Sequence, residues 1–126
     1  MSRLLAMPER GLLTGGTAFI ALGLLVLDLP LTLRAGVLIV LAPLTEELVF
    51  RAGLHESLLR GLRAPWVANT LTALVFALAH VLARGEAAAF GVALPALLVG
   101  IVYQRWRRVW PCVLLHAAMN AIWLAI

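Results

Sequence analysis

The sequence predicts an all-α fold, a polytopic membrane helical bundle with about five transmembrane helices. Hydrophobic residues make up 63% of the chain and charged residues 13%, and the mean hydropathy is +1.03. Soluble globular domains are roughly 45–50% apolar and 25% charged. Apolar stretches of about 20 residues, the length that crosses a bilayer, alternate with short turns rich in arginine, glycine or proline. The 126 residues leave room for one integral-membrane domain, residues 1–126.

The first predicted helix spans about residues 11–29 and follows Arg3 and Arg10. These features are also found in signal peptides, but the apolar stretch is long and no small-residue cleavage site follows it. We therefore expect a retained helix.

The second predicted helix spans about residues 33–59. It contains Pro43, which we expect to bend the helix because proline removes one backbone hydrogen bond. His55 and Glu56 lie near its far end, where we expect a solvated face.

The remaining predicted helices span about residues 66–83, 87–103 and 110–126. The last of them contains the lone Cys112. A single cysteine cannot form a disulfide within the chain, so we expect a buried thiol that fills the core.

Arginine accounts for all ten basic residues, and most of them lie in alternate turns. With a cytoplasmic N-terminus, the arginine-rich turns face the cytoplasm, as the positive-inside rule requires. These arginines are Arg3, Arg10, Arg60, Arg63, Arg105, Arg107 and Arg108, against Arg34 and Arg84 on the other side. The charge therefore indicates a multi-pass protein of the cell inner membrane, in contact with the lipid bilayer, and not a nucleic-acid-binding protein.

Two adjacent carboxylates and an arginine, Glu46, Glu47 and Arg51, interrupt the second apolar stretch. A charged group at membrane depth costs at least about 2.5 kcal/mol, so it normally faces a protein interior and has a function. Glu47 and Arg51 are four residues apart and are expected to form a structural ion pair. Glu46 points about 100° away from Glu47 and has no basic neighbour at helical spacing, so its partner must come from elsewhere in the fold.

Three further polar residues lie in later apolar stretches: His80, His116 and Asn120. His116 and Asn120 are four apart and share one face of the last helix. Counted at 1.5 Å per residue from the arginine-rich turns, all three lie in the same depth band as Glu46, roughly 12–22 Å deep. On its own, His80 would be equally well explained by a hydrogen bond to Asn69, Thr72 or a helix carbonyl.

The motifs EExxxR, FxxxH and HxxxN begin at Glu46, Phe76 and His116 in this order. This set resembles the CPBP family of intramembrane proteases, which includes the type II CAAX prenyl endopeptidases and bacterial relatives labelled Abi. Ala42 and Pro43 before the glutamates fit the same pattern. The resemblance implies an intramembrane endopeptidase that hydrolyses a peptide bond of a membrane-associated protein or peptide.

The resemblance also implies roles for four catalytic residues. Glu46 and His80 would activate the water, while His116 and Asn120 would stabilise the oxyanion. Peptide hydrolysis needs a base and oxyanion donors, which these residue types can supply. Many family members carry additional N-terminal helices, so we expect the substrate surface here either to be reduced or to be supplied by a second copy of the chain or another membrane partner.

Two alternatives concern the mechanism and the class of function. The family was long described as metalloproteases, and Glu46, His80 and His116 could ligate zinc. The sequence lacks HExxH, and Asn120 is a poor zinc ligand, so we expect a glutamate-activated water and no cofactor.

The alternative class of function is a non-catalytic membrane protein for bacteriocin self-immunity or scaffolding. The substrate stays open between a prenylated C-terminus, a C-terminal sorting tag and a membrane-anchored precursor.

Overall fold

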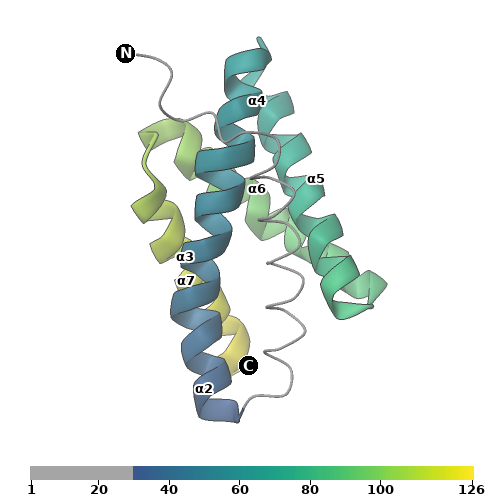
Figure 1. The fold of residues 1–126 in the computed structure, drawn as a ribbon, viewed down its shortest axis with the longest axis vertical. Helices are drawn as coiled ribbons and strands as arrows, with labels where there is room; N and C mark the ends of the chain where they lie inside the picture. Colours follow the sequence, from purple (N-terminus) through teal and green to yellow (C-terminus); the bar gives the residue numbers. More distant parts are fainter. Residues whose placement is uncertain (1–29) are drawn as a thin grey trace.

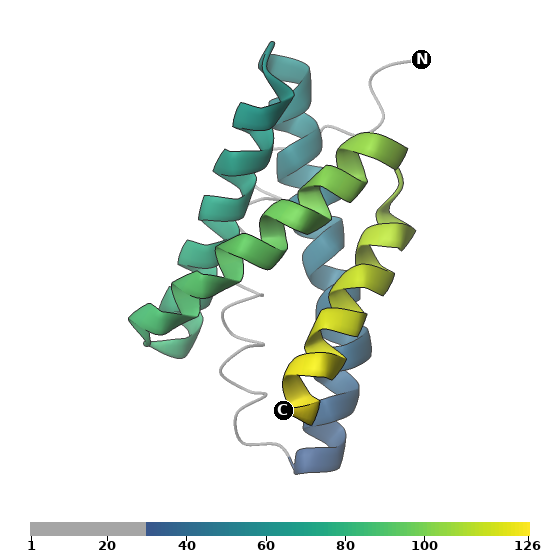
Figure 2. The same ribbon diagram turned by 180° about the vertical axis from the view of Figure 1, so that it is seen from behind.

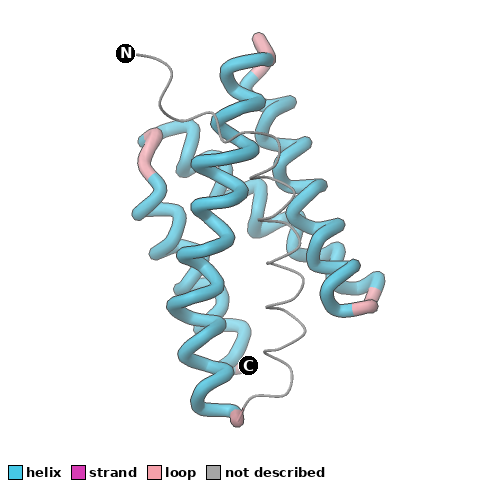
Figure 3. Tube along the Cα trace, viewed as in Figure 1, coloured by secondary structure: helices cyan, strands magenta, loops and turns pink. Residues whose placement is uncertain are grey.

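The computed structural model describes residues 30–126. This part of the chain consists of helices and short connections and has no strand, as Figure 3 shows. The all-helical prediction is therefore confirmed for the described residues. The first predicted helix, residues 11–29, lies outside them.

The glutamate motif lies in one helical run that continues without a break from residue 31 to residue 61. Its consecutive segments are α2 (Leu31–Gly36), η1 (Val37–Leu41), α3 (Ala42–Glu47), η2 (Leu48–His55) and α4 (Glu56–Gly61). The segments η1 and η2 are π-helical, with wider turns than an α-helix. Wider turns of this kind are frequent at functional sites.

Three further helices follow. They are α5 (Pro65–Arg84), α6 (Ala93–Trp106), which follows the 3₁₀ segment η3 (Ala87–Val92), and α7 (Val109–Ala125). The bounds of α5 and α7 lie within one residue of the predicted ones, whereas the predicted helix 87–103 begins as a separate 3₁₀ segment and its α-helix starts six residues later and ends three residues later. Proline opens α5 at its first turn, where its missing N–H costs nothing. Gly85 ends α5 at a φ of 70°, a left-handed conformation that glycine adopts easily.

Two stretches of the described part are long and apolar enough to cross a membrane. Pro65–Arg84 and Ala87–Trp106 each have 20 residues, with mean hydropathies of 1.7 and 1.8. Val109–Ala125 is a shorter apolar helix. The predicted total of five transmembrane helices thus stays a prediction.

The helices run up and down the long axis of the molecule. In Figure 1, α5 returns from the α4 end, and the C-terminus lies near the start of α2. Figure 2 shows α6 crossing the bundle obliquely, with α7 beside the long helical run. Helix α7 packs against α6, η1 and α3, and Cys112 on its inner face is fully buried, as expected. This packing brings α7 alongside the glutamate motif.

Pro43 is fully buried and does not interrupt the helix. Just before it, in η1, the amide of Ala42 bonds to the Val37 carbonyl five residues back. The next bond of this series would join residue 43 to Leu38, but proline has no N–H to donate. Asn120 of α7 supplies the missing donor, with 2.7 Å between Asn120 Nδ2 and the Leu38 oxygen. Pro43 is therefore accompanied by a wider helical turn, and it leaves the Leu38 carbonyl to accept a hydrogen bond from α7.

Helices α5 and α6 approach each other closely at Gly100. A Cβ atom at this position would overlap the Asn69 side-chain amide. That amide is held in place because its Nδ2 donates to the Leu97 carbonyl, at 3.1 Å. The absence of a side chain at residue 100 thus permits this helix contact.

A second group of polar contacts, here called the end cluster, fastens α4 to α6 at the end of the bundle where α4 and α6 finish. It consists of Glu56, Arg60, Tyr103 and Arg107. Both oxygens of Glu56 accept from Arg107 Nη2 at 2.8 Å. The Tyr103 hydroxyl and Arg60 Nε donate to the same carboxylate at 2.9 and 3.1 Å.

Neighbouring His55 differs from the expected solvated face. Its side chain has no exposed area, because its ring packs against the ring of Tyr103, with 5.4 Å between the two ring centroids. Gln104 lies on its other side, with 3.3 Å between Gln104 Nε2 and His55 Nε2. The prediction was wrong because α6 covers this face of the long helix.

Candidate active site

The carboxylate of Glu47 joins two helices at the centre of the bundle. One oxygen accepts from Arg51 Nε at 2.8 Å, which confirms the predicted ion pair. The other lies 2.8 Å from His116 Nδ1 on α7. Glu47 and Arg51 are completely buried, and Arg51 also donates to the Ala96 carbonyl of α6 at 3.1 Å. Three parts of the fold therefore meet at Glu47.

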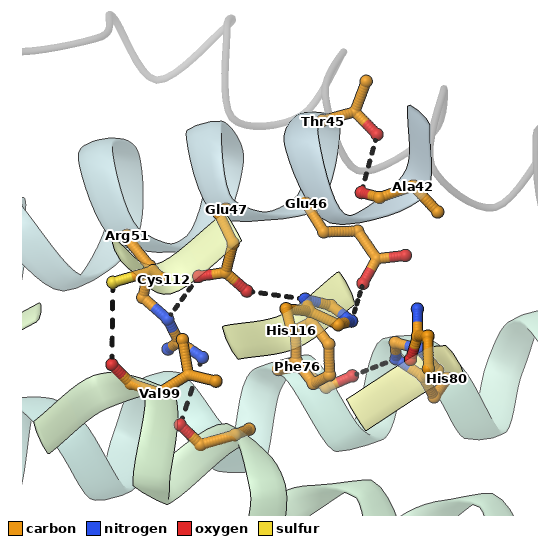
Figure 4. A network of polar contacts seen from close by, with 12 residues as sticks. Ala42, Thr45, Glu46, Glu47, Arg51, Phe76, His80, Val99, Cys112 and His116 are labelled. Carbon is orange, nitrogen blue, oxygen red and sulfur yellow. Dashed lines mark hydrogen bonds and ion pairs between the residues drawn. The ribbon is translucent and has the colours of Figure 1, made fainter. Parts of the chain in front are cut away.

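Glu46 lies beside this pair and is 6% exposed. Figure 4 shows that the carboxylates of Glu46 and Glu47 both point towards the ring of His116. The Glu46 Oε2 atom lies 3.5 Å from His116 Nε2, longer than a well-formed hydrogen bond. This oxygen has no hydrogen-bond partner in the part of the chain that the structure describes. The imidazole of His116 is thus placed between the two carboxylates.

His80 reaches this group through Phe76. The two rings are one helical turn apart on α5, with centroids 4.4 Å from each other. The ring of Phe76 also contacts His116 edge-on, at 5.8 Å between centroids. His80 Nδ1 lies 3.0 Å from the Phe76 carbonyl oxygen. The sequence had suggested Asn69, Thr72 or a helix carbonyl as a partner, and this contact is with a helix carbonyl. The bond to this carbonyl fixes the orientation of the His80 ring.

Asn120 lies one turn beyond His116 on α7, and its amide bonds to Leu38 as described above. An amide nitrogen carries two hydrogens, so this bond uses one of them and orients the other.

The contacts of His116 limit what this residue can do. Its Nδ1 faces a carboxylate that is already paired with Arg51, so Nδ1 carries a proton and donates it. The remaining nitrogen, Nε2, faces Glu46. In neutral His116 it accepts a hydrogen bond, and it can donate one only when both ring nitrogens carry protons.

A metal centre is not preformed here. Within residues 30–126, no three His, Cys, Asp or Glu side chains gather closely enough to hold a metal ion. The alternative ligand set of Glu46, His80 and His116 is therefore not assembled as a zinc site in this structure.

The sequence had indicated Glu47 and Arg51 only as a supporting pair, and it gave no reason to connect Glu47 with His116. It also missed the Leu38 carbonyl as the partner of Asn120. One signal for the latter was present, because Pro43 lies five residues after Leu38 and leaves a carbonyl without its helical donor.

Comparison with protein families identifies a matching family. The model of the type II CAAX prenyl endopeptidase Rce1-like family matches residues 28–122, which include the glutamate motif, His80, His116 and Asn120. Comparison with curated proteins and with solved structures gives no match. Because the match covers most of the chain and every motif, the chain belongs to the Rce1-like family of type II CAAX prenyl endopeptidases.

Proposed function

We propose that this protein is an intramembrane endopeptidase in which Glu46 activates a water molecule. Family membership implies endopeptidase activity in a membrane. The observation that supports the glutamate mechanism is the environment of Glu46, a carboxylate 6% exposed with one oxygen that has no hydrogen-bond partner among the described residues. Buried polar atoms normally have partners, so an oxygen without one suits proton transfer during a reaction.

In the proposed reaction, Glu46 carries one proton from the attacking water to the leaving amine. Glu46 takes a proton from water as the water oxygen attacks the carbonyl carbon of the scissile bond. The resulting tetrahedral oxyanion needs donors close to it. When the C–N bond breaks, Glu46 returns the proton to the leaving amine. No step requires a redox cofactor.

His80 and Asn120 complete the site in this proposal. His80 holds the water, since its Nδ1 is directed to the Phe76 carbonyl and its ring orientation is fixed. Asn120 donates its second N–H to the oxyanion, while the first stays on Leu38. His116 donates from Nε2 when it is doubly protonated, with Glu47 holding the proton on Nδ1.

The proposed substrate is a membrane-anchored protein or peptide cleaved near its C-terminus, and the family description points to a prenylated one. The proposed topology is a multi-pass inner-membrane protein with the arginine-rich turns in the cytoplasm. A non-catalytic immunity or scaffolding role is not favoured by family membership.

The experiment measures cleavage of a library of membrane-anchored peptides, with and without prenyl groups, by the purified full-length protein in detergent. Glu46→Gln keeps the shape of the side chain and removes the base, so we expect cleavage to fall about 10²–10⁴-fold. Asn120→Ala removes one oxyanion donor and is expected to cost about 10²–10³-fold. Glu86→Gln, at an exposed turn, serves as the matched control and should cleave normally.

Thermal unfolding verifies that each variant is folded. Full cleavage by folded Glu46→Gln would refute the role of Glu46. Loss of wild-type cleavage in excess zinc chelator would instead point to the metal mechanism.

A further inference from the structure

A hollow of about 480 Å³ lies at the turn between α6 and α7, outside the candidate active site. It is lined by Arg105, Trp106, Arg108 and Pro111. Two of these four residues are arginines, and both are exposed. The hollow thus presents two positive charges at the same end of the bundle as the turn that contains Arg63.

Within residues 30–126, no carboxylate pairs with these two charges. The nearby carboxylate of Glu56 is already occupied by Arg60, Arg107 and Tyr103. Arg107 turns away from the hollow because its left-handed backbone, with φ 53°, ends α6 and carries its guanidinium to Glu56. Within residues 30–126, neither Arg105 nor Arg108 has an ion-pair partner. An anion that enters the hollow would meet two guanidinium groups that are not paired with any carboxylate of the described residues.

An apolar surface leads away from this hollow along α6. Leu94, Leu98 and Ile101 are 71%, 54% and 56% exposed. Their spacing of four and three residues places them on one helix face, and Arg105 continues that face four residues later. From Leu94 to Arg105 this face is roughly 16 Å long at 1.5 Å per residue, about half of the hydrocarbon thickness of a bilayer.

Two exposed tryptophans lie in the sequence around the turn between α6 and α7 that forms the hollow. Trp106 lines the hollow, and Trp110 follows on α7, with 58% and 68% of their areas exposed. Tryptophan is enriched where the headgroups of a membrane meet its acyl chains. Arginine binds phosphate oxygens through two parallel hydrogen bonds.

We propose that this hollow binds the phosphate of an anionic phospholipid, with an acyl chain lying along the Leu94, Leu98 and Ile101 face of α6. A free phosphate would use the two arginines but not the apolar face. The lipid uses both, as well as Trp106, which lines the hollow. Basic pockets between transmembrane helices are known to select anionic headgroups.

The test is native mass spectrometry of the full-length protein in detergent, titrated with phosphatidylglycerol or with phosphatidylcholine of the same acyl chains. We expect the wild type to bind phosphatidylglycerol more tightly. Loss of each guanidinium should weaken this binding about fivefold, so binding to Arg105→Gln/Arg108→Gln should be about 25-fold weaker. Binding of phosphatidylcholine should stay nearly constant.

Two comparisons separate the hollow from surface charge and from misfolding. Arg63→Gln removes an exposed arginine at the same end of the bundle but outside the hollow, and should change binding less than twofold. Arg105→Lys/Arg108→Lys keeps both charges and should retain most of the preference. An equal loss in Arg63→Gln, or a lysine variant as weak as the glutamine variant, would overturn the proposal. Displacement of the lipid by millimolar glycerol phosphate would show a phosphate site without lipid contact and would also overturn it.

Discussion

Glu47 at the centre of the bundle and Glu56 at its end both pair with an arginine four residues later, but their surroundings differ. The side chains of Glu47 and Arg51 are both 0% exposed, whereas those of Glu56 and Arg60 are 12% and 44% exposed. The same spacing thus produces a buried pair in one place and a surface pair in the other. The difference depends on which helices cover the pair, because α6 and α7 both pack over the central one.

The two clusters also differ in how completely their carboxylates are bonded. Both oxygens of Glu56 have donors from α4, α6 or the turn after α6. The central cluster consists of Glu46, Glu47, Arg51 and His116. In it both oxygens of Glu47 have hydrogen-bond partners, but Glu46 has an oxygen with no hydrogen-bond partner in the described part of the chain. In the proposed mechanism this oxygen of Glu46 takes the proton from water, whereas Glu56 in the end cluster only joins helices.

The largest expected effect is that of Arg51→Met. It leaves the Glu47 charge buried without its partner, which costs roughly 3–5 kcal/mol. The free energy of unfolding can be measured by titrating the protein in mild detergent with a denaturing one. In the control variant Glu47→Leu/Arg51→Met both charges are gone, so more than half of the loss should be recovered. If the double variant is less stable than Arg51→Met, the buried pair is not the source of the effect.

A smaller loss is expected for Gly100→Ala. Residue 100 lies on α6 between Ala96, which contacts the central cluster, and Tyr103, which belongs to the end cluster. The added methyl group would displace the Asn69 amide from Leu97, at a cost of about 1–3 kcal/mol. Combined with Asn69→Ala, the same substitution should cost less than the sum of the two single changes. Strict additivity in the unfolding titration would contradict the close contact.

The smallest effect is expected for Glu56→Gln. Its arginine partners, Arg60 and Arg107, are 44% and 49% exposed, so solvent screens these pairs and the loss should be about 0–1 kcal/mol. The loss should also shrink as salt is added, unlike that of Arg51→Met. A cost of several kcal/mol, independent of salt, would mean that the two clusters are alike after all.

The sequence by itself determined the helices and the local pair. Apolar stretches bounded by proline, glycine and arginine predicted both ends of α5 and of α7 to within one residue. These signals act between neighbouring residues, so they can be recognised in the sequence alone. The Glu47–Arg51 ion pair followed from helical spacing for the same reason. The motif residues and their family resemblance were also available from the sequence, and the family match over residues 28–122 confirms the resemblance.

Only the tertiary structure decided which side chains meet. His116 contacts Glu47 from 69 residues away, and Asn120 contacts Leu38 from 82 residues away. It also decided that His55 is buried and that Glu46 Oε2 has no hydrogen-bond partner within residues 30–126. The physical reason is that membrane helices are apolar on nearly all sides, so hydrophobic periodicity does not fix their rotation. Rotation and crossing angle are set by close contacts such as Gly100 with Asn69, which involve residues far apart in the chain.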